Sequence, residues 1–74
     1  RFSRNMIIRI NGSERQFACD EWPASVAQLL DYLQIDQATV VAEIDGQIVQ
    51  RKEFSNTSLA EGQSIELIRF VGGG

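Results

Sequence analysis

The chain has 74 residues, which is enough for one small domain and too few for a second. Hydrophobic residues make up 43% and charged residues 23%, as in folded globular domains, and the formal net charge of −3 argues against a nucleic-acid binder. With no histidine and one cysteine, the sequence excludes disulfide frameworks, the common zinc sites and His-activated nucleophiles. Because no apolar run reaches the roughly 18 residues of a membrane span, and the lone cysteine fits a reducing compartment, we expect a cytoplasmic protein.

Residues 1–5 are polar and basic, and they lack the apolar stretch of a signal peptide. We interpret them either as residues added for expression, which we favour because Met6 would be a natural start, or as a short disordered extension. The folded domain is then expected over residues 6–71. Residues 72–74 are expected to form a flexible glycine tail.

The first predicted element is a β-hairpin. Apolar residues alternate over residues 6–10, which indicates a strand, and Ile7 lies on the face opposite to most of them. The Asn11-Gly12 dipeptide that follows is a strong hairpin signal, because a type I′ turn needs a positive φ at both central positions. The return strand is expected at about residues 13–19.

Two residues near the end of this hairpin could have either a functional or a structural role. Cys19 can be read as a thiol that handles sulfur, but it shares a face with Phe17, so we interpret it as a small hydrophobic residue of the core. Trp22 precedes Pro23 at the entrance to the next element, and we expect it to cover the edge of the core.

A helix is predicted from near Ser25 to about Gln34. Ser25 and Gln28 have the spacing of a capping box, in which the serine side chain accepts a hydrogen bond from the backbone N–H three residues later. Four apolar residues recur at helical spacing and form one stripe directed at a sheet: Val26, Leu29, Leu30 and Leu33.

Three further strands are predicted. Residues 39–44 are rich in β-branched side chains, and Asp45-Gly46 is a second type I′ signal that joins them to a short strand at 47–49. The last strand is expected at 64–71. Two residues of the irregular crossover before it are expected to fill the core: Phe54 and Leu59.

Together these elements predict an α+β domain with the β-grasp, ubiquitin-like architecture. A small sheet with one main helix packed across a single face is an economical way to bury both apolar surfaces. The strand–helix–strand crossovers make part of the sheet mixed rather than purely antiparallel.

The last strand carries apolar residues on both of its faces. If Ile65 and Leu67 face the helix, then Ile68 and Phe70 lie on the helix-free side, where with Ile7 they would make an exposed apolar patch. Such a patch usually marks a partner surface, and the alternatives are dimerisation or simple tolerance of exposed apolar residues. The predicted partner-binding residues are Ile7, Ile68, Phe70 and Val71. Four cationic residues are expected at the rim: Arg9, Arg51, Lys52 and Arg69.

Gly72, Gly73 and Gly74 close the sequence. One interpretation is a frayed end or a cloning scar. The other is a reactive terminus, because glycines can pass through a narrow channel of a partner enzyme. A C-terminal carboxylate is ionised at neutral pH and is able to attack an activated phosphate.

Several segments, in order along the chain, resemble the ThiS family of thiamine-pathway sulfur carriers: residues 11–12, 25–30, 40–51, 61–62 and 69–74. The resemblance covers essentially all of residues 6–74. Its most specific parts are the stretch V-A-E-I-D-G-Q-I-V-Q-R and the ending F-V-G-G-G.

This resemblance implies a carrier and not an enzyme. In such a family, an E1-like adenylating enzyme of the ThiF type uses ATP and magnesium to adenylate the terminal carboxylate, here that of Gly74. A persulfide donor, such as a cysteine desulfurase, then supplies sulfur to form a thiocarboxylate, and thiazole synthase of the ThiG type takes that sulfur for the thiazole ring. Gly72 and Gly73 would thread the tail into these enzymes. The carrier itself would bind no cofactor and no metal.

Two other functions stay open. A sulfur carrier of another pathway, such as molybdopterin synthesis, would use the same tail with a different synthase, although the short chain and the D-G-x-I-V segment favour the thiamine carrier. A non-covalent β-grasp adaptor would carry its glycines incidentally. None of these functions involves a nucleic acid or a membrane.

Overall fold

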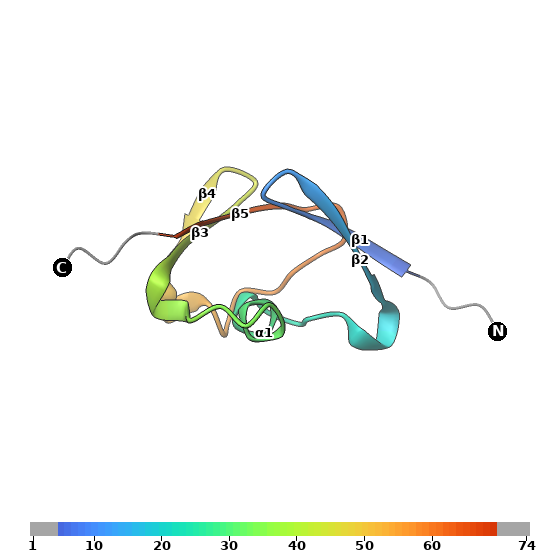
Figure 1. Ribbon diagram of the computed structural model, residues 1–74, viewed down its shortest axis with the longest axis horizontal. Helices are drawn as coiled ribbons and strands as arrows, with labels where there is room; N and C mark the ends of the chain where they lie inside the picture. Colours follow the sequence, from blue (N-terminus) through green and yellow to red (C-terminus); the bar gives the residue numbers. More distant parts are fainter. Residues whose placement is uncertain (1–4, 70–74) are drawn as a thin grey trace.

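The computed structural model describes residues 5–69. Within this range five strands form one sheet in the order β2-β1-β5-β3-β4, and helix α1 (Val26–Tyr32) packs across one of its faces (Figure 1). The strands are β1 (Asn5–Ile10), β2 (Ser13–Ala18), β3 (Val40–Ile44), β4 (Gln47–Val49) and β5 (Ser64–Arg69). Short 3-10 helices connect them: η1 (Cys19–Glu21), η2 (Gln37–Thr39) and η3 (Arg51–Glu53). β1 and β5 run parallel, while the other neighbouring strands are antiparallel, so the predicted mixed β-grasp sheet is confirmed.

The two hairpins turn where the sequence predicts. Asn11 and Gly12 have φ angles of 51° and 84°, and Asp45 and Gly46 have φ angles of 50° and 87°. Both dipeptides therefore occupy the left-handed region that a type I′ turn requires. β1 begins at Asn5, opposite Ala18, which is one residue before the predicted start of this strand at residue 6.

The start of α1 is capped by the predicted pair. The Gln28 N–H donates to the Ser25 side chain at 3.2 Å, and the Ala24 N–H donates to the Gln28 Oε1 at 3.0 Å. The first bond satisfies a backbone donor that the helix leaves free, and the second satisfies the N–H of the residue before the cap. Ser25 itself is buried.

Replacing Ser25 with alanine should lower the free energy of unfolding by about 1 kcal/mol, because the cap's acceptor is lost while the helix stripe stays in place. Thermal or chemical denaturation followed by circular dichroism measures this. Ser58→Ala is the matched control, since Ser58 is exposed. Its effect should stay within about 0.5 kcal/mol. Equal losses in the two variants would contradict the capping role.

The helix ends at Tyr32, two residues before the predicted end at Gln34. Gln34 has a φ of 60°, and the Ile35 N–H donates to the Leu30 carbonyl at 2.9 Å. The Gln34 N–H donates to the Asp31 carbonyl at 3.1 Å. These two bonds make a Schellman motif, which closes a helix at a left-handed residue.

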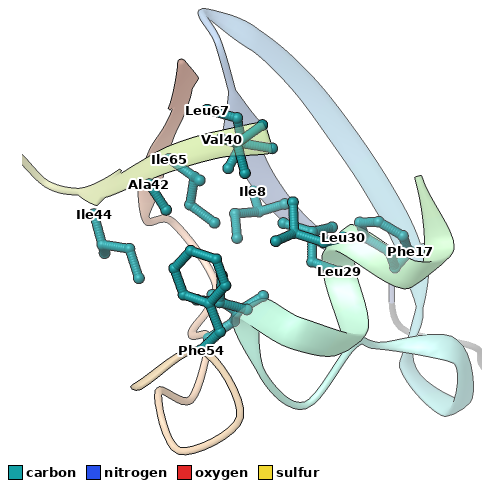
Figure 2. Packing of buried hydrophobic residues seen from close by; sticks show 12 residues of the cluster. Ile8, Phe17, Leu29, Leu30, Val40, Ala42, Ile44, Phe54, Ile65 and Leu67 are labelled. Carbon is teal, nitrogen blue, oxygen red and sulfur yellow. The ribbon is translucent and has the colours of Figure 1, made fainter. Parts of the chain in front are cut away.

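The core lies between the sheet and α1. Figure 2 shows Ile8, Ala42, Ile65 and other strand residues directed toward the helix, with Phe54 of the crossover beside them. Phe54 is 1% exposed and Leu59 is 7% exposed, so both fill the core as predicted. Trp22 packs against the core edge, and its Nε1 donates to the Leu59 carbonyl at 3.3 Å.

The predicted burial of Cys19 is wrong. β2 ends at Ala18, and Cys19 opens η1 as an exposed, free thiol. The alternation that placed Cys19 on the same face as Phe17 holds only while the strand continues, and here the chain leaves the sheet one residue earlier. The nearest sulfur contact joins the Cys19 Sγ to the Met6 Sδ at 3.9 Å.

Candidate functional site

The helix-free face of the sheet carries an exposed apolar patch across β3, β4 and β5. Val41 is 36% exposed, Ile48 67% and Ile68 49%. Val41 lies directly opposite Ile68 in the β3–β5 ladder, and Ile48 lies opposite Glu43, two residues from Val41. We call Val41, Ile48 and Ile68 the open-face patch. The helix-facing positions alternate with them, since Ile65 and Leu67 are 0% and 8% exposed.

This patch matches the predicted partner surface only in part. Ile68 lies on the helix-free face, as its alternation with Ile65 and Leu67 predicts. Ile7 does not lie next to Ile68, because β1 pairs with the beginning of β5. The Ile7 carbonyl accepts from the Gly62 N–H, so Ile7 lies six positions, or about 20 Å, from Ile68 along the strands. Two predicted partner residues, Phe70 and Val71, lie outside the described residues.

Sequence reasoning missed Val41 and Ile48. Val41 stands next to Val40, and both residues are β-branched, so composition alone does not show which one faces water. The signal is the alternation in β3, where Val40, Ala42 and Ile44 are buried. The position of Ile48 on the helix-free face follows from the Asp45-Gly46 turn, because this turn sets the register in which β4 pairs with β3.

An acidic pair borders the open-face patch. Glu43 of β3 lies directly opposite Glu66 of β5, and both positions lie on the helix-free face. Like charges that face each other across an antiparallel ladder destabilise a sheet. A partner that brings a lysine or arginine to this pair would relieve that repulsion, so the patch and its border together favour a basic, apolar partner surface.

The predicted cationic rim is divided between several places. Arg9 forms an ion pair with Glu14, with 3.3 Å between Nη2 and Oε2. Arg51 and Lys52 are exposed in η3, directly after β4. Arg69 has the same parity as Leu67 in β5, which places it on the helix side rather than beside the patch.

A shallow cavity of about 520 Å³ continues the open-face patch around the β4 edge. Its lining includes the apolar residues Val41, Ile48 and Val49 and the polar residues Gln37, Gln50 and Arg51. A lining that is partly apolar and carries two amides and one cation can receive a side chain of a docked protein.

β5 connects this face to the end of the chain. It is the central strand, between β1 and β3, and Arg69, its last residue, lies opposite Val40. Ile68, the β5 member of the patch, is adjacent to Arg69. The predicted reactive residues Gly72, Gly73 and Gly74 lie outside the described residues.

The side chains of residues 5–69 hold no group of three or more His, Cys, Asp or Glu that could bind a metal ion. In the same part of the chain, no helix has both the length and the apolar character to cross a membrane.

A mixed five-stranded sheet with one helix across a single face defines a small β-grasp domain, whose helix-free face carries the exposed open-face patch. The sequence model of the ThiS family matches residues 8–74. The chain therefore belongs to the ThiS family.

Solved structures support this assignment. The crystal structure of the thiamine biosynthesis protein ThiS from Geobacter metallireducens superposes with a TM-score of 0.77 at 31% identity, covering 93% of this chain and 100% of that one. A solution structure of a thiamine biosynthesis protein from the same organism gives a TM-score of 0.72 at 31% identity, covering 93% of this chain and 88% of that one.

Two curated sequences extend the comparison. An uncharacterised protein, ycf40, of Porphyra purpurea is 33% identical over 72 residues, which is 97% of each chain. A thiazole synthase of Paramagnetospirillum magneticum is 32% identical over 69 residues, which is 93% of this chain and 20% of that protein. The similarity to the synthase is thus confined to one fifth of its length.

Proposed function

We propose that this protein is the sulfur carrier of thiamine biosynthesis and that the carboxylate of Gly74 carries the sulfur. The observation that carries the proposal is the ThiS family match, which runs to Gly74 and so includes the terminal glycines. The two superposed structures named as thiamine biosynthesis proteins support the same pathway.

The proposed chemistry needs no catalytic side chain from the carrier. The Gly74 carboxylate attacks the α-phosphate of ATP, so that an acyl-adenylate forms and pyrophosphate leaves. A persulfide then attacks the acyl carbon and displaces AMP, and cleavage of its sulfur–sulfur bond by a thiol leaves the thiocarboxylate. ATP and magnesium are held by the ThiF-like adenylating enzyme. The carrier's task is to dock and to present its end.

Thiazole synthase is the proposed acceptor of the sulfur. The thiazole synthase of Paramagnetospirillum magneticum contains a segment similar to 93% of this chain. In that protein a carrier-like domain and a synthase belong to one polypeptide, which supports a functional pairing of the two. The open-face patch, Val41, Ile48 and Ile68, is the proposed docking surface for the adenylating enzyme, with the acidic border formed by Glu43 and Glu66.

The test is intact-mass spectrometry of a reconstituted system. The chain is incubated with ATP, magnesium, a ThiF-like adenylating enzyme and a cysteine desulfurase with cysteine. A gain in mass equal to one oxygen-to-sulfur exchange, located at the C-terminus by fragmentation, supports the proposal. A chain that binds the adenylating enzyme and never gains this mass would be an adaptor. Sulfur transfer to a molybdopterin precursor in place of the thiazole would assign the sibling pathway.

Changing Gly73 to valine should reduce thiocarboxylate formation by about a hundredfold or more, because a β-branched side chain does not fit a channel shaped for a bare backbone. Gly73→Ala adds one methyl group and should lose less. The melting temperature of both variants should match that of the wild type, since the buried cluster is built from residues between Ile8 and Leu67. A valine variant with full activity would show that the tail does not pass through a narrow channel.

A further inference from the structure

The side chain of Asn11 binds the backbone of β5. Its Oδ1 accepts from the Leu67 N–H at 2.7 Å, and its Nδ2 donates to the Leu67 carbonyl at 3.3 Å. The backbone N–H of Asn11 also donates to the Ile65 carbonyl at 2.8 Å. One turn residue thus makes three hydrogen bonds to the central strand, across a sequence separation of 56 residues for Leu67.

The hydrogen bonds from the Asn11 side chain take the place of strand pairing that β1 does not provide to Leu67. The parallel ladder between β1 and β5 pairs Arg9 with Ser64 and Ile10 with Ile65, and β1 then turns away at Asn11. Among the described residues, no strand continues alongside Leu67 on this side. A primary amide offers one acceptor and a donor in the same arrangement as a peptide group. Asn11 therefore satisfies both backbone groups of Leu67 in a partly buried position, where leaving them unpaired is costly.

The other hairpin turn holds the opposite end of β5. The Ser64 N–H donates to the Asp45 Oδ1 at 3.0 Å, and the Asp45 N–H donates to the Ser64 carbonyl at 2.8 Å. Asp45 and Asn11 occupy the same position in their turns, with φ angles of 50° and 51°. Asp45 fixes the first residue of β5, whereas Asn11 fixes a residue two positions before Arg69.

We propose that Asn11 is a positioning residue for the chemistry at Gly74, because it sets the direction in which the chain leaves β5. This inference rests on the proposed carrier function. Without the amide, the last residues of β5 are held by β3 on one side only, and the direction of the strand end varies more. The glycine tail starts from this strand end. A strand end that is held in place relative to the docked open-face patch leaves fewer orientations for the enzyme to remove before the carboxylate meets the phosphate, so the reaction is faster.

The test compares Asn11→Gly with Asp45→Gly. Glycine accepts a positive φ, so both turns keep their geometry while each variant loses its side-chain bonds to β5. Both variants should melt a few degrees lower than the wild type. Only Asn11→Gly should lower kcat, the rate of mass gain at saturating carrier, by about tenfold or more. Its KM should change by less than about twofold, because the open-face patch is intact. Asp45→Gly should keep kcat within about twofold of wild type.

Amide hydrogen exchange supplies a readout that does not depend on the enzymes. Exchange at Leu67 should accelerate in Asn11→Gly and stay close to wild type in Asp45→Gly, measured below the melting temperature. Asn11→Asp keeps the acceptor for the Leu67 N–H and loses the donor to its carbonyl, so its kcat should fall between those of wild type and glycine variant.

Two outcomes overturn the inference while the proposed function stands. In the first, the wild-type chain gains sulfur and the Asn11→Gly variant gains it at the same rate. In the second, Asn11→Gly and Asp45→Gly lose kcat equally. A wild-type chain that gains no sulfur overturns the proposed function, and the inference with it.

Discussion

Deleting Gly74 should largely prevent the gain of sulfur in the reconstituted system. The deletion moves the terminal carboxylate back by one residue, a reach of up to about 3.3–3.6 Å, and so takes it out of line with the α-phosphate of ATP. We expect a loss of at least about a hundredfold in the rate of mass gain. Intact-mass spectrometry against the wild-type chain measures it, and the melting temperature should not change.

The matched control for this deletion is Cys19→Ser. Cys19 is an exposed thiol, so it is the one side chain of the described residues that could accept sulfur directly from a persulfide. The serine variant should gain sulfur at the wild-type rate. Sulfur found on Cys19, or an undiminished gain after removal of Gly74, would contradict the proposed carrier chemistry.

Aspartate at two positions of β5 should have opposite consequences. Ile65 is 0% exposed and Ile68 is 49% exposed, on opposite faces of the same strand. Ile65→Asp buries a carboxylate at a cost of several kcal/mol, which is comparable to the whole stability of a domain of this size, so the variant should be unfolded. Ile68→Asp should stay folded and weaken binding to the adenylating enzyme by more than about 1 kcal/mol, because the charge must be desolvated within the interface.

Circular dichroism and a binding titration separate the two effects. Gln16→Asp is the control for charge, because Gln16 is exposed on β2 opposite Ile7, on the same face of the sheet and away from the open-face patch. It should bind as the wild type does. Unfolding of Ile68→Asp would mean that the faces of β5 are assigned wrongly, and equal weakening by Gln16→Asp would mean that net charge, not the patch, controls docking.

Most of the fold is predictable because its signals are local. Asn11-Gly12 and Asp45-Gly46 meet the φ requirement of their turns without help from the rest of the chain, and the Ser25 cap needs only Gln28, three residues away. The helix end was harder, because Gln34 adopts a positive φ that its residue type does not favour.

The errors arise where tertiary structure decides. The departure of the chain from the sheet at Ala18 exposes Cys19, and no residue type at that point indicates that β2 has ended. Asn11 was predicted as a turn residue, which it is, but its bonds to Leu67 depend on two strands at opposite ends of the sequence lying side by side. Such a contact has no local signal.

The residues of the candidate site also differ in whether a local sequence pattern predicts them. The exposure of Ile68 can be predicted from the alternation within one strand. That Val41 and Ile48 lie near Ile68 depends on the registers in which β3 pairs with β5 and with β4. The proposed role of Gly74 rests on the ThiS family match, because that residue lies outside the described structure.

The central place of β5 also has a consequence for synthesis on the ribosome. β5 is the last of the five strands to be translated, yet it fills the gap between β1 and β3 and supplies Ile65 and Leu67 to the core (Figure 1). A nascent chain that has reached only β4 holds two separate hairpins and an uncovered helix stripe, and such a chain has no core to stabilise it. Premature termination before β5 should therefore yield a product that proteases remove, so truncated carriers do not accumulate and compete for the partner enzymes.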